Sequence, residues 1–171
     1  ILNINKTTGV FVHGDGGRHA VQWVFPENFT GTGLSVVMRG QYPTHNKNMG
    51  VFFGMAGITF VHQGTGTSGT ALHVEERAGI SNPSLYLHDL TFNSLDGSSW
   101  AKGEDLLDVN IDLNEGTACI NSFNGICVNY DSDGPLGVEH HVNRLYVNGN
   151  NSFIGINIGH PGMASNLQGF T

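Results

Sequence analysis

Ala71-Leu72-His73-Val74-Glu75 is the stretch that decides the fold class. Aliphatic and polar residues alternate in it, which is the pattern of a β-strand with one buried face and one exposed face. Three further stretches carry the same pattern: Leu106-Leu107-Asp108-Val109-Asn110, Gly125-Ile126-Cys127-Val128-Asn129 and Phe153-Ile154-Gly155-Ile156-Asn157. A strand that returns every few tens of residues, with loops of variable length between the copies, is typical of a solenoid.

A second type of strand precedes these copies. It comprises Ile58-Thr59-Phe60-Val61, Leu90-Thr91-Phe92 and Leu145-Tyr146-Val147, and Leu167-Gln168-Gly169-Phe170 is expected to open the next one. The interval between Phe92 and Val147 is long enough for two turns of a solenoid, with Ala118-Cys119-Ile120 as the short strand between them. The repeating unit is therefore strand, turn, strand and longer loop.

Length and composition favour a single all-β domain. A chain of 171 residues forms one domain, with less regular coils over 1–48 and regular coils over 49–171. Charged residues make up 12% of the chain and glycine contributes 25 positions, which suits short strands and tight turns better than helices. The stretch from Ser98 to Asp105 is the only candidate for a helix.

Net charge, hydropathy and cysteine content limit which partners and which cellular environment the protein is expected to have. The formal charge of −7 argues against nucleic acid or an anionic membrane as the main partner, and no run is long and apolar enough to span a bilayer. The chain has no signal peptide or initiator Met and ends inside strand-like sequence, so we expect a segment of a longer protein. Cys119 and Cys127 are too few for a disulfide framework, so we expect reduced, buried thiols.

Glycine-punctuated coils carry a family resemblance. Gly57-Ile58-Thr59-Phe60 with Gly69-Thr70-Ala71-Leu72-His73-Val74, and Arg144-Leu145-Tyr146-Val147 with Ile154-Gly155-Ile156-Asn157-Ile158-Gly159, resemble coils of the right-handed parallel β-helices of the pectate-lyase-like superfamily. Within it, the sequence looks most like the β-helical domain of a bacteriophage tailspike or capsule depolymerase. The resemblance implies a single-stranded solenoid, a homotrimer, a place in the virion tail or outside the cell, and a bacterial capsule or lipopolysaccharide O-antigen as partner. The aspartate calcium ligands and nearby arginine of pectate lyases cannot be placed on particular residues here.

The polar positions of the recurring strand define a candidate functional face. Successive strands of a parallel sheet lie about 4.8 Å apart, so aligning the copies on Val74, Val109, Val128 and Ile156 predicts neighbours in space. The candidate catalytic residues are the carboxylates Glu75, Asp108, Asp112 and Asp131. The candidate substrate-binding residues are His73, Arg77, Asn110 and Asn129 on the same face, and Trp100 in a loop beside it.

Two pairs of these carboxylates have spacings that glycoside hydrolysis uses. From the strand spacing, we expect Asp112 and Asp131 to stack roughly 5 Å apart, and Glu75 and Asp108 to lie roughly 8 Å apart. Retaining glycosidases hold their two carboxyl groups about 5–5.5 Å apart, and inverting ones about 6.5–9.5 Å apart. Two carboxylates held close together also raise the pKa of one of them, which supplies a proton donor.

Other side chains add to this hypothesis or are excluded from it. Arg77 or His73 would orient an acidic sugar and Trp100 would stack on a sugar ring, whereas Trp23 and Tyr130 are expected in the core. No Cys/His spacing matches a zinc site, and Asp131-Ser132-Asp133-Gly134 lacks the Glu that a calcium loop requires. We therefore expect no metal and no cofactor.

The sequence leaves three functions open. The first is hydrolysis of a bacterial surface polysaccharide by a carboxylate pair. The second is a lyase that acts on the same class of substrate through Arg77 or a histidine. The third is a non-catalytic adhesin or structural spacer, in which outward Asn and Asp side chains only form polar ladders that keep the sheet soluble. A close carboxylate pair would favour an enzyme, and a face of Asn and Thr without one would favour the spacer.

Overall fold

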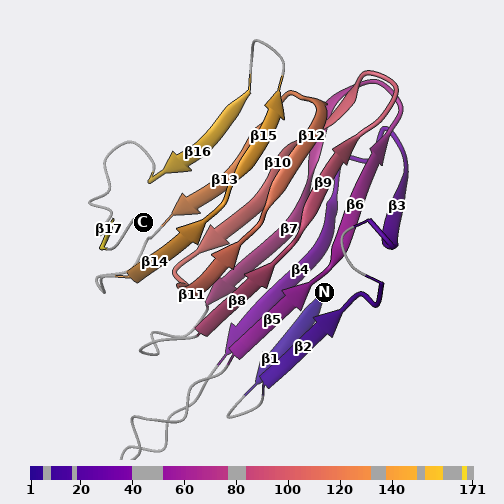
Figure 1. Cartoon of the computed structure of the whole chain (residues 1–171). Coiled ribbons are helices and arrows are strands. Elements are labelled where there is room, and N and C mark those ends of the chain that lie inside the picture. The colour runs from indigo at the N-terminus through magenta and orange to yellow at the C-terminus, as the bar shows by residue number, and fades with distance from the viewer. Residues whose placement is uncertain are drawn as a thin grey trace, which may run out of the picture.

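The computed structural model describes residues 1–5, 9–16, 19–39, 52–76, 84–131, 138–149, 153–159 and 167–168. Within these ranges the chain forms strands and turns and no helix (Figure 1). The stretch from Ser98 to Asp105, the only candidate for a helix, belongs to the long strand β10 (Ser98–Leu107). The helix prediction is therefore wrong, because pairing with two neighbouring strands decides the conformation of this segment.

Three parallel sheets make up the described structure. Sheet A contains β1 (Leu2–Asn5), β4 (Thr32–Arg39), β7 (Gly66–Glu76), β10, β13 (Ile126–Asp131) and β16 (Ile154–Ile158). Sheet B contains β2 (Gly9–His13), β5 (Phe52–Ala56), β8 (Ser84–His88), β11 (Asn110–Glu115), β14 (Val138–Asn143) and β17 (Leu167–Gln168). Sheet C contains β3 (Val21–Glu27), β6 (Ile58–Gln63), β9 (Thr91–Ser94), β12 (Ala118–Phe123) and β15 (Tyr146–Gly149).

The chain visits the sheets in the order A, B, C and then repeats that order. Each strand pairs in parallel with the strand three places before or after it, and the colour in Figure 1 runs along each sheet from one end of the stack to the other. The all-β class with parallel sheets is thus confirmed. This rotation already includes β1 to β4, within residues 1–48. The strand at Leu167–Gln168 pairs with β14 of sheet B, so its expected grouping with the strands of sheet C is wrong.

The register of sheet C is the one expected from the sequence. Phe60 pairs with Phe92, Phe92 with Cys119, and Cys119 with Val147. The first three of these side chains are buried, and the rings of Phe60 and Phe92 stack with their centroids 5.4 Å apart. Trp23 packs edge-on against Phe60 and belongs to the border of the core, as predicted.

The register of sheet A differs from the one expected. Val74 pairs with Leu106, and Leu106 pairs with Tyr130. Val109 lies beyond the end of β10, where only Asp108 and Val109 separate this strand from β11. Val109 is therefore not equivalent to Val74, whereas the predicted equivalence of Val128 and Ile156 is confirmed. Leu72, Val74, Leu106 and Tyr130 are all buried, so these strands do alternate between core and outer face.

A disulfide joins sheets A and C. Cys119 of β12 and Cys127 of β13 are bonded, with their Cα atoms 5.9 Å apart. The expectation of reduced thiols is therefore wrong, although both residues are buried as predicted. The turn between β12 and β13 returns the chain toward itself within eight residues, which brings the two side chains together.

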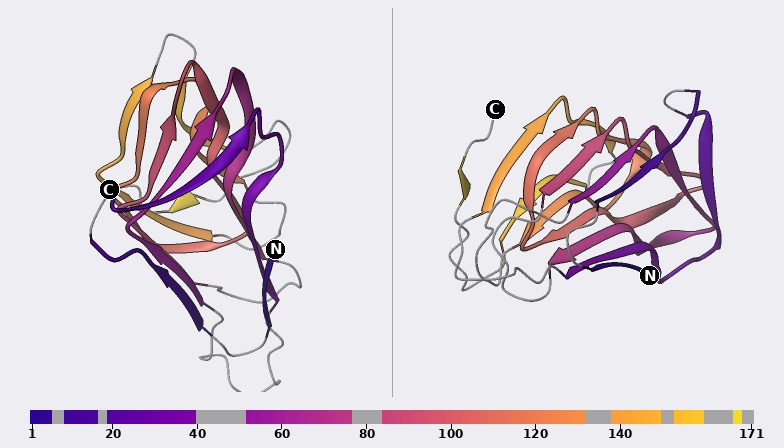
Figure 2. Two further views of the ribbon diagram at one scale, coloured as in Figure 1. Left: turned by 90° about the vertical axis from the view of Figure 1, so that its right-hand side faces the viewer. Right: turned by 90° about the horizontal axis from the view of Figure 1, so that it is seen from below.

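A corner of one or two residues separates sheet B from sheet C in successive coils. Gly57, Asp89, Gly116 and Arg144 follow the ends of β5, β8, β11 and β14, and all four have positive φ. Three of these residues donate a backbone hydrogen bond to the corner of the next coil: Gly57 to His88, Asp89 to Glu115 and Gly116 to Asn143. The turned views of Figure 2 show how these bends bring the strands of the three sheets around a common interior.

Candidate functional site

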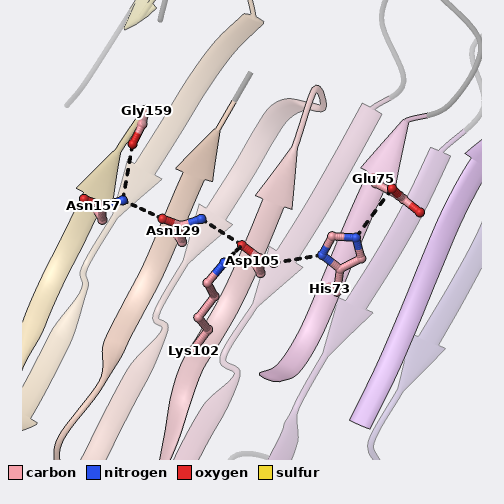
Figure 3. A network of polar contacts seen from close by, with 7 residues as sticks. All are labelled: His73, Glu75, Lys102, Asp105, Asn129, Asn157 and Gly159. Atoms are coloured by element: carbon pink, nitrogen blue, oxygen red, sulfur yellow. Dashed lines mark hydrogen bonds and ion pairs between the residues drawn. The ribbon is translucent and has the colours of Figure 1, made fainter. Parts of the chain in front are cut away.

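A row of polar side chains crosses the outer face of sheet A (Figure 3). His73 of β7, Asp105 of β10, Asn129 of β13 and Asn157 of β16 occupy one register position on four adjacent strands. Their positions alternate with inward residues such as Leu72 and Val74, which explains why they point away from the core. We call these four residues the sheet A ladder.

Hydrogen bonds link the members of the sheet A ladder in sequence. Nδ2 of Asn157 donates to Oδ1 of Asn129 at 2.6 Å, and Nδ2 of Asn129 donates to Oδ1 of Asp105 at 2.7 Å. Nδ1 of His73 lies 3.0 Å from Oδ2 of Asp105, and Nζ of Lys102 lies 2.7 Å from Oδ1. Asp105 therefore accepts from three side chains and is the centre of the network.

The environment of Asp105 keeps this carboxyl group ionised. Partial burial alone would raise its pKa, but hydrogen bonds from His73, Lys102 and Asn129, together with the charge of Lys102, lower the pKa to about 2. A carboxylate with so low a pKa is a poor proton donor at neutral pH. Asp105 is suited to orienting His73 and Lys102.

His73 lies between two carboxylates. Its Nδ1 atom faces Asp105, and its Nε2 atom lies 3.7 Å from Oε2 of Glu75. The hydrogen bond with Asp105 raises the pKa of His73 above 6.5, burial opposes this, and the charges of Asp105 and Glu75 add to the increase. The imidazole can therefore carry a positive charge near neutral pH, with its orientation fixed from the Asp105 side.

Two of the four predicted catalytic residues share one column of this face. Glu75 pairs with Leu107, and Leu107 pairs with Asp131, so the two carboxylates lie on the same side of sheet A with one strand between them. Two strand spacings amount to about 9.5 Å. The sequence alignment had placed these residues in different columns.

The other two predicted catalytic residues lie elsewhere. Asp112 belongs to β11 of sheet B, so the predicted stack of Asp112 on Asp131 is wrong. Asp108 follows β10 at a corner with φ of 54°, and its backbone N–H donates to the carbonyl of Asp131 at 3.0 Å. Glu75 faces Leu107 instead, because β10 ends one residue before Asp108.

The predicted binding residues are also divided. His73 and Asn129 belong to the sheet A ladder, as described above. Asn110 opens β11 of sheet B and pairs with Ser84, so its predicted place in one column with Glu75 and Asn129 is wrong. Arg77 lies outside the described residues.

Trp100 is part of the core, and its predicted position in an exposed loop is wrong. The residue lies within β10 and is fully buried. Its indole N–H donates to the carbonyl of Phe60 at 3.2 Å, and its ring packs edge-on against Phe25 and His62. A ring enclosed in this way has no free face for a sugar.

Two polar features of the structure have no counterpart among the residues predicted from the sequence. The first is the pair of Asp105 and Lys102, which lies in the stretch that the sequence marks as a candidate helix. The signal that could have identified Asp105 is its position next to the aliphatic Leu106, as in the other strands of sheet A. The second feature is Glu104, a fully buried carboxyl group inside the molecule that contacts Asn114 and Thr117. Burial raises its pKa to about 7, although hydrogen bonds to Thr117 and Asn114 act in the opposite direction.

Neither a metal site in the described ranges nor a known relative identifies a function. Across the described ranges, no cluster of three or more His, Cys, Asp or Glu is arranged to hold a metal ion. The same part of the chain contains no helix that would cross a membrane. No family model, curated protein or solved structure matches the chain.

Proposed function

We propose that this chain is a coil segment of a right-handed parallel β-helix that binds a bacterial surface polysaccharide on the outer face of sheet A and hydrolyses it. The repeated rotation through sheets A, B and C supports a β-helix, because each of the five complete rotations among the described strands, β1–β3 to β13–β15, contributes one strand to each sheet. The narrower proposal, a phage tailspike or capsule depolymerase, comes from the resemblance of the glycine-punctuated coils.

The arrangement of Glu75 and Asp131 carries the enzymatic proposal. They lie in one column of sheet A, separated by two strand spacings, about 9.5 Å. Inverting glycosidases place their carboxyl groups about 6.5–9.5 Å apart, so that a water molecule fits between one carboxyl group and the sugar. One of the two would protonate the leaving oxygen and the other would activate the water.

The sheet A ladder would bind the substrate. An extended sugar chain that crosses the strands meets one ladder residue per strand, and the partly exposed amide of Asn157 combines a donor and an acceptor for hydroxyl groups. Asn129 is buried and bonded to Asp105 and Asn157, so it supports its neighbours. Lys102 and His73 are ion-paired with Asp105 and Glu75, so the ladder offers balanced charge and hydrogen-bonding groups rather than an excess of positive charge. A lyase that uses His73 would act on the same substrates.

A non-catalytic adhesin or spacer is the second candidate, and a specific observation favours it. The members of the sheet A ladder already bind one another, from Asn157 through Asn129 to Asp105. A ladder of this kind rigidifies the sheet without any ligand. The enzyme and the adhesin or spacer differ in whether Glu75 and Asp131 catalyse cleavage of the polysaccharide.

Two observations support the proposed location and assembly. The disulfide between Cys119 and Cys127 fits an extracellular protein, because disulfides persist in oxidising environments. Phe11, Phe52 and Tyr86 are exposed on three adjacent strands of sheet B, and exposed apolar patches commonly mark protein contacts. We place the contacts of a homotrimer there.

Cleavage assays on a panel of bacterial capsules and lipopolysaccharides test this function. The samples are the wild type, Glu75→Gln, Asp131→Asn and the control Asp112→Asn, which removes a charge from sheet B. Release of reducing ends that is lost in the first two variants and kept in the control would support hydrolysis. Release accompanied by the ultraviolet absorbance of an unsaturated sugar would mean a lyase. Binding without cleavage would leave the adhesin.

A further inference from the structure

A closed ring of three polar side chains lies inside the molecule, on the opposite side of β10 from the sheet A ladder. Glu104 of β10, Asn114 of β11 and Thr117 of the corner before β12 meet in the coil formed by β10, β11 and β12. The three residues have almost no exposed surface. Their polar atoms therefore depend on one another for hydrogen bonds.

Three short contacts close the ring. Nδ2 of Asn114 lies 2.5 Å from Oε2 of Glu104, Oγ1 of Thr117 lies 2.8 Å from Oε1 of Glu104, and the same Oγ1 lies 2.7 Å from Oδ1 of Asn114. Nδ2 of Asn114 also donates to the hydroxyl group of Tyr130 at 3.2 Å. Each ring contact requires one hydrogen atom between its two heavy atoms.

An ionised Glu104 leaves one ring contact without a hydrogen. A threonine hydroxyl has a single hydrogen, so Thr117 cannot donate to both Glu104 and Asn114. Rotating the Asn114 amide does not help, because its oxygen would then face the carboxylate oxygen of Glu104 without a hydrogen. In either orientation of the amide, the third hydrogen must come from Glu104.

We propose that the folded protein holds Glu104 as a neutral carboxylic acid whose hydroxyl group completes this ring, and that loss of the proton in alkaline solution loosens the coil of β10, β11 and β12. Glu104 donates to Thr117, Thr117 donates to Asn114, and Asn114 donates back to Glu104. Asp105, the centre of the sheet A ladder, is the next residue of β10. Release of the buried proton would therefore also disturb the outer face.

The surroundings of Glu104 contain no compensating positive charge among the described residues. Leu72 of β7 and Val128 of β13 occupy the positions paired with Glu104, and the titratable group facing it is the phenol of Tyr130. Lys102 of the same strand binds Asp105 on the outer face. Burial raises the pKa of Glu104 to about 7, in agreement with the count of hydrogen atoms.

The predicted pH dependence follows from the difference between the folded and unfolded states. Between pH 4.5 and about 7 the unfolded chain ionises at Glu104 while the folded protein keeps the proton. Folding then takes up a proton, so stability falls as the pH rises through this interval and levels off above it. The loss corresponds to a decrease of roughly 300-fold in the folding equilibrium constant.

Glu104→Gln is the decisive variant, because the uncharged amide of glutamine has a donor nitrogen and an acceptor oxygen, where a neutral carboxylic acid has a donor hydroxyl group and an acceptor oxygen. Denaturant unfolding of the oxidised full chain should show that the wild type is much less stable at about pH 9 than at about pH 5. Glu104→Gln should not show this large decrease in stability. Asp96→Asn, which removes an exposed carboxylate, should keep the wild-type dependence. Parallel pH profiles of wild type and Glu104→Gln, or a Glu104→Gln protein that is less stable than wild type at about pH 9, would overturn the proposal.

Infrared spectroscopy of the wild type keeps the proposal falsifiable if Glu104→Gln does not fold. At about pH 6 most exposed carboxyl groups are ionised, so the carbonyl band of one protonated carboxylic acid should stand out. Thr117→Val, which removes the hydroxyl partner of Glu104, should shift this band. A wild-type spectrum without a protonated carboxylic acid would refute the neutral Glu104.

Discussion

Nδ1 of His73 lies 3.0 Å from Oδ2 of Asp105, and the two residues face each other across the pairing of β7 with β10. The residues are 32 positions apart in the chain. One register position thus unites a histidine whose pKa is raised with the carboxylate that raises it.

Removing the charge of Asp105 should lower the pKa of His73. In Asp105→Asn the imidazole loses its strongest favourable partner, while the partial burial that opposes protonation remains. Titration of the His73 ring protons by NMR measures this effect, with Asp112→Asn as a control on sheet B. An unchanged pKa of His73 in Asp105→Asn would show that the pair does not interact in solution.

The same pair should make the stability of the protein depend on pH in two ranges, one acidic and one above pH 6.5. The pKa of Asp105 is lowered from 3.8 to about 2, so its stabilising contribution is present above pH 3.8 and is lost as the pH falls toward 2. The pKa of His73 is raised, so its contribution is complete below pH 6.5 and is lost as the pH rises through the higher value. Denaturant unfolding from acid to neutral pH should show the acid loss in the wild type and a much smaller one in Asp105→Asn.

Loss of the disulfide should destabilise the protein by roughly 2–3 kcal/mol, the amount expected for closure of a short loop. Cys119 and Cys127 are eight residues apart and buried, so replacing both by alanine removes the cross-link with little change in exposed surface. Addition of reductant should lower the free energy of unfolding of the wild type to that of the double variant. It should leave the free energy of unfolding of the variant unchanged. Two reactive thiols in the unfolded, non-reduced wild type would contradict the disulfide.

Gly57→Ala should destabilise the corner between sheets B and C. Gly57 has φ of 68°, and an added Cβ would lie 2.8 Å from the carbonyl oxygen of Gly14. A non-glycine residue in this conformation costs about 1–2 kcal/mol before the contact is counted. Gly97→Ala is the matched control, because its φ is 84° with no atom within 4 Å. Equal losses of thermal stability in the two variants would show that the contact with Gly14 adds nothing.

Trp100 should behave as a core residue in every measurement. Trp100→Ala should reduce the free energy of unfolding by about 3–5 kcal/mol, because it opens a large cavity. In a Trp23→Phe background the remaining fluorescence should resist a soluble quencher and stay constant on addition of polysaccharide. Quenching by a bound sugar would restore the role of a stacking platform.

The sequence predicted sheet C well, because its inward positions are consistently apolar. Phe60, Phe92 and Cys119 stack in the expected register, and the short strand between Phe92 and Val147 lies where the spacing required it. The register of sheet A was harder to predict. An alternating pattern looks the same when one strand is shifted by two residues, so it does not fix which residues of neighbouring strands pair. Val109 fits the local pattern as well as Leu106 does, and only the two-residue link to β11 excludes it from the strand.

Glu104 illustrates what the sequence could not reveal. It occupies the position that Leu72 and Val128 fill in the adjacent strands, where alternation calls for an apolar side chain. The partners that make this position acceptable are Asn114 of β11 and Thr117 of the corner after β11. The sequence of β10 alone therefore does not indicate that Glu104 points inward.

The sequence by itself determined that this protein is built from repeated parallel strands, because alternation and glycine-rich turns are local properties of the chain. It also pointed to an outward polar face that includes His73, Glu75 and Asn129. Tertiary structure alone decided that Asp105 joins His73, that Glu75 and Asp131 share a column, and that Trp100 is enclosed. These relationships depend on the register between coils, which is set by packing and corner lengths over the whole chain.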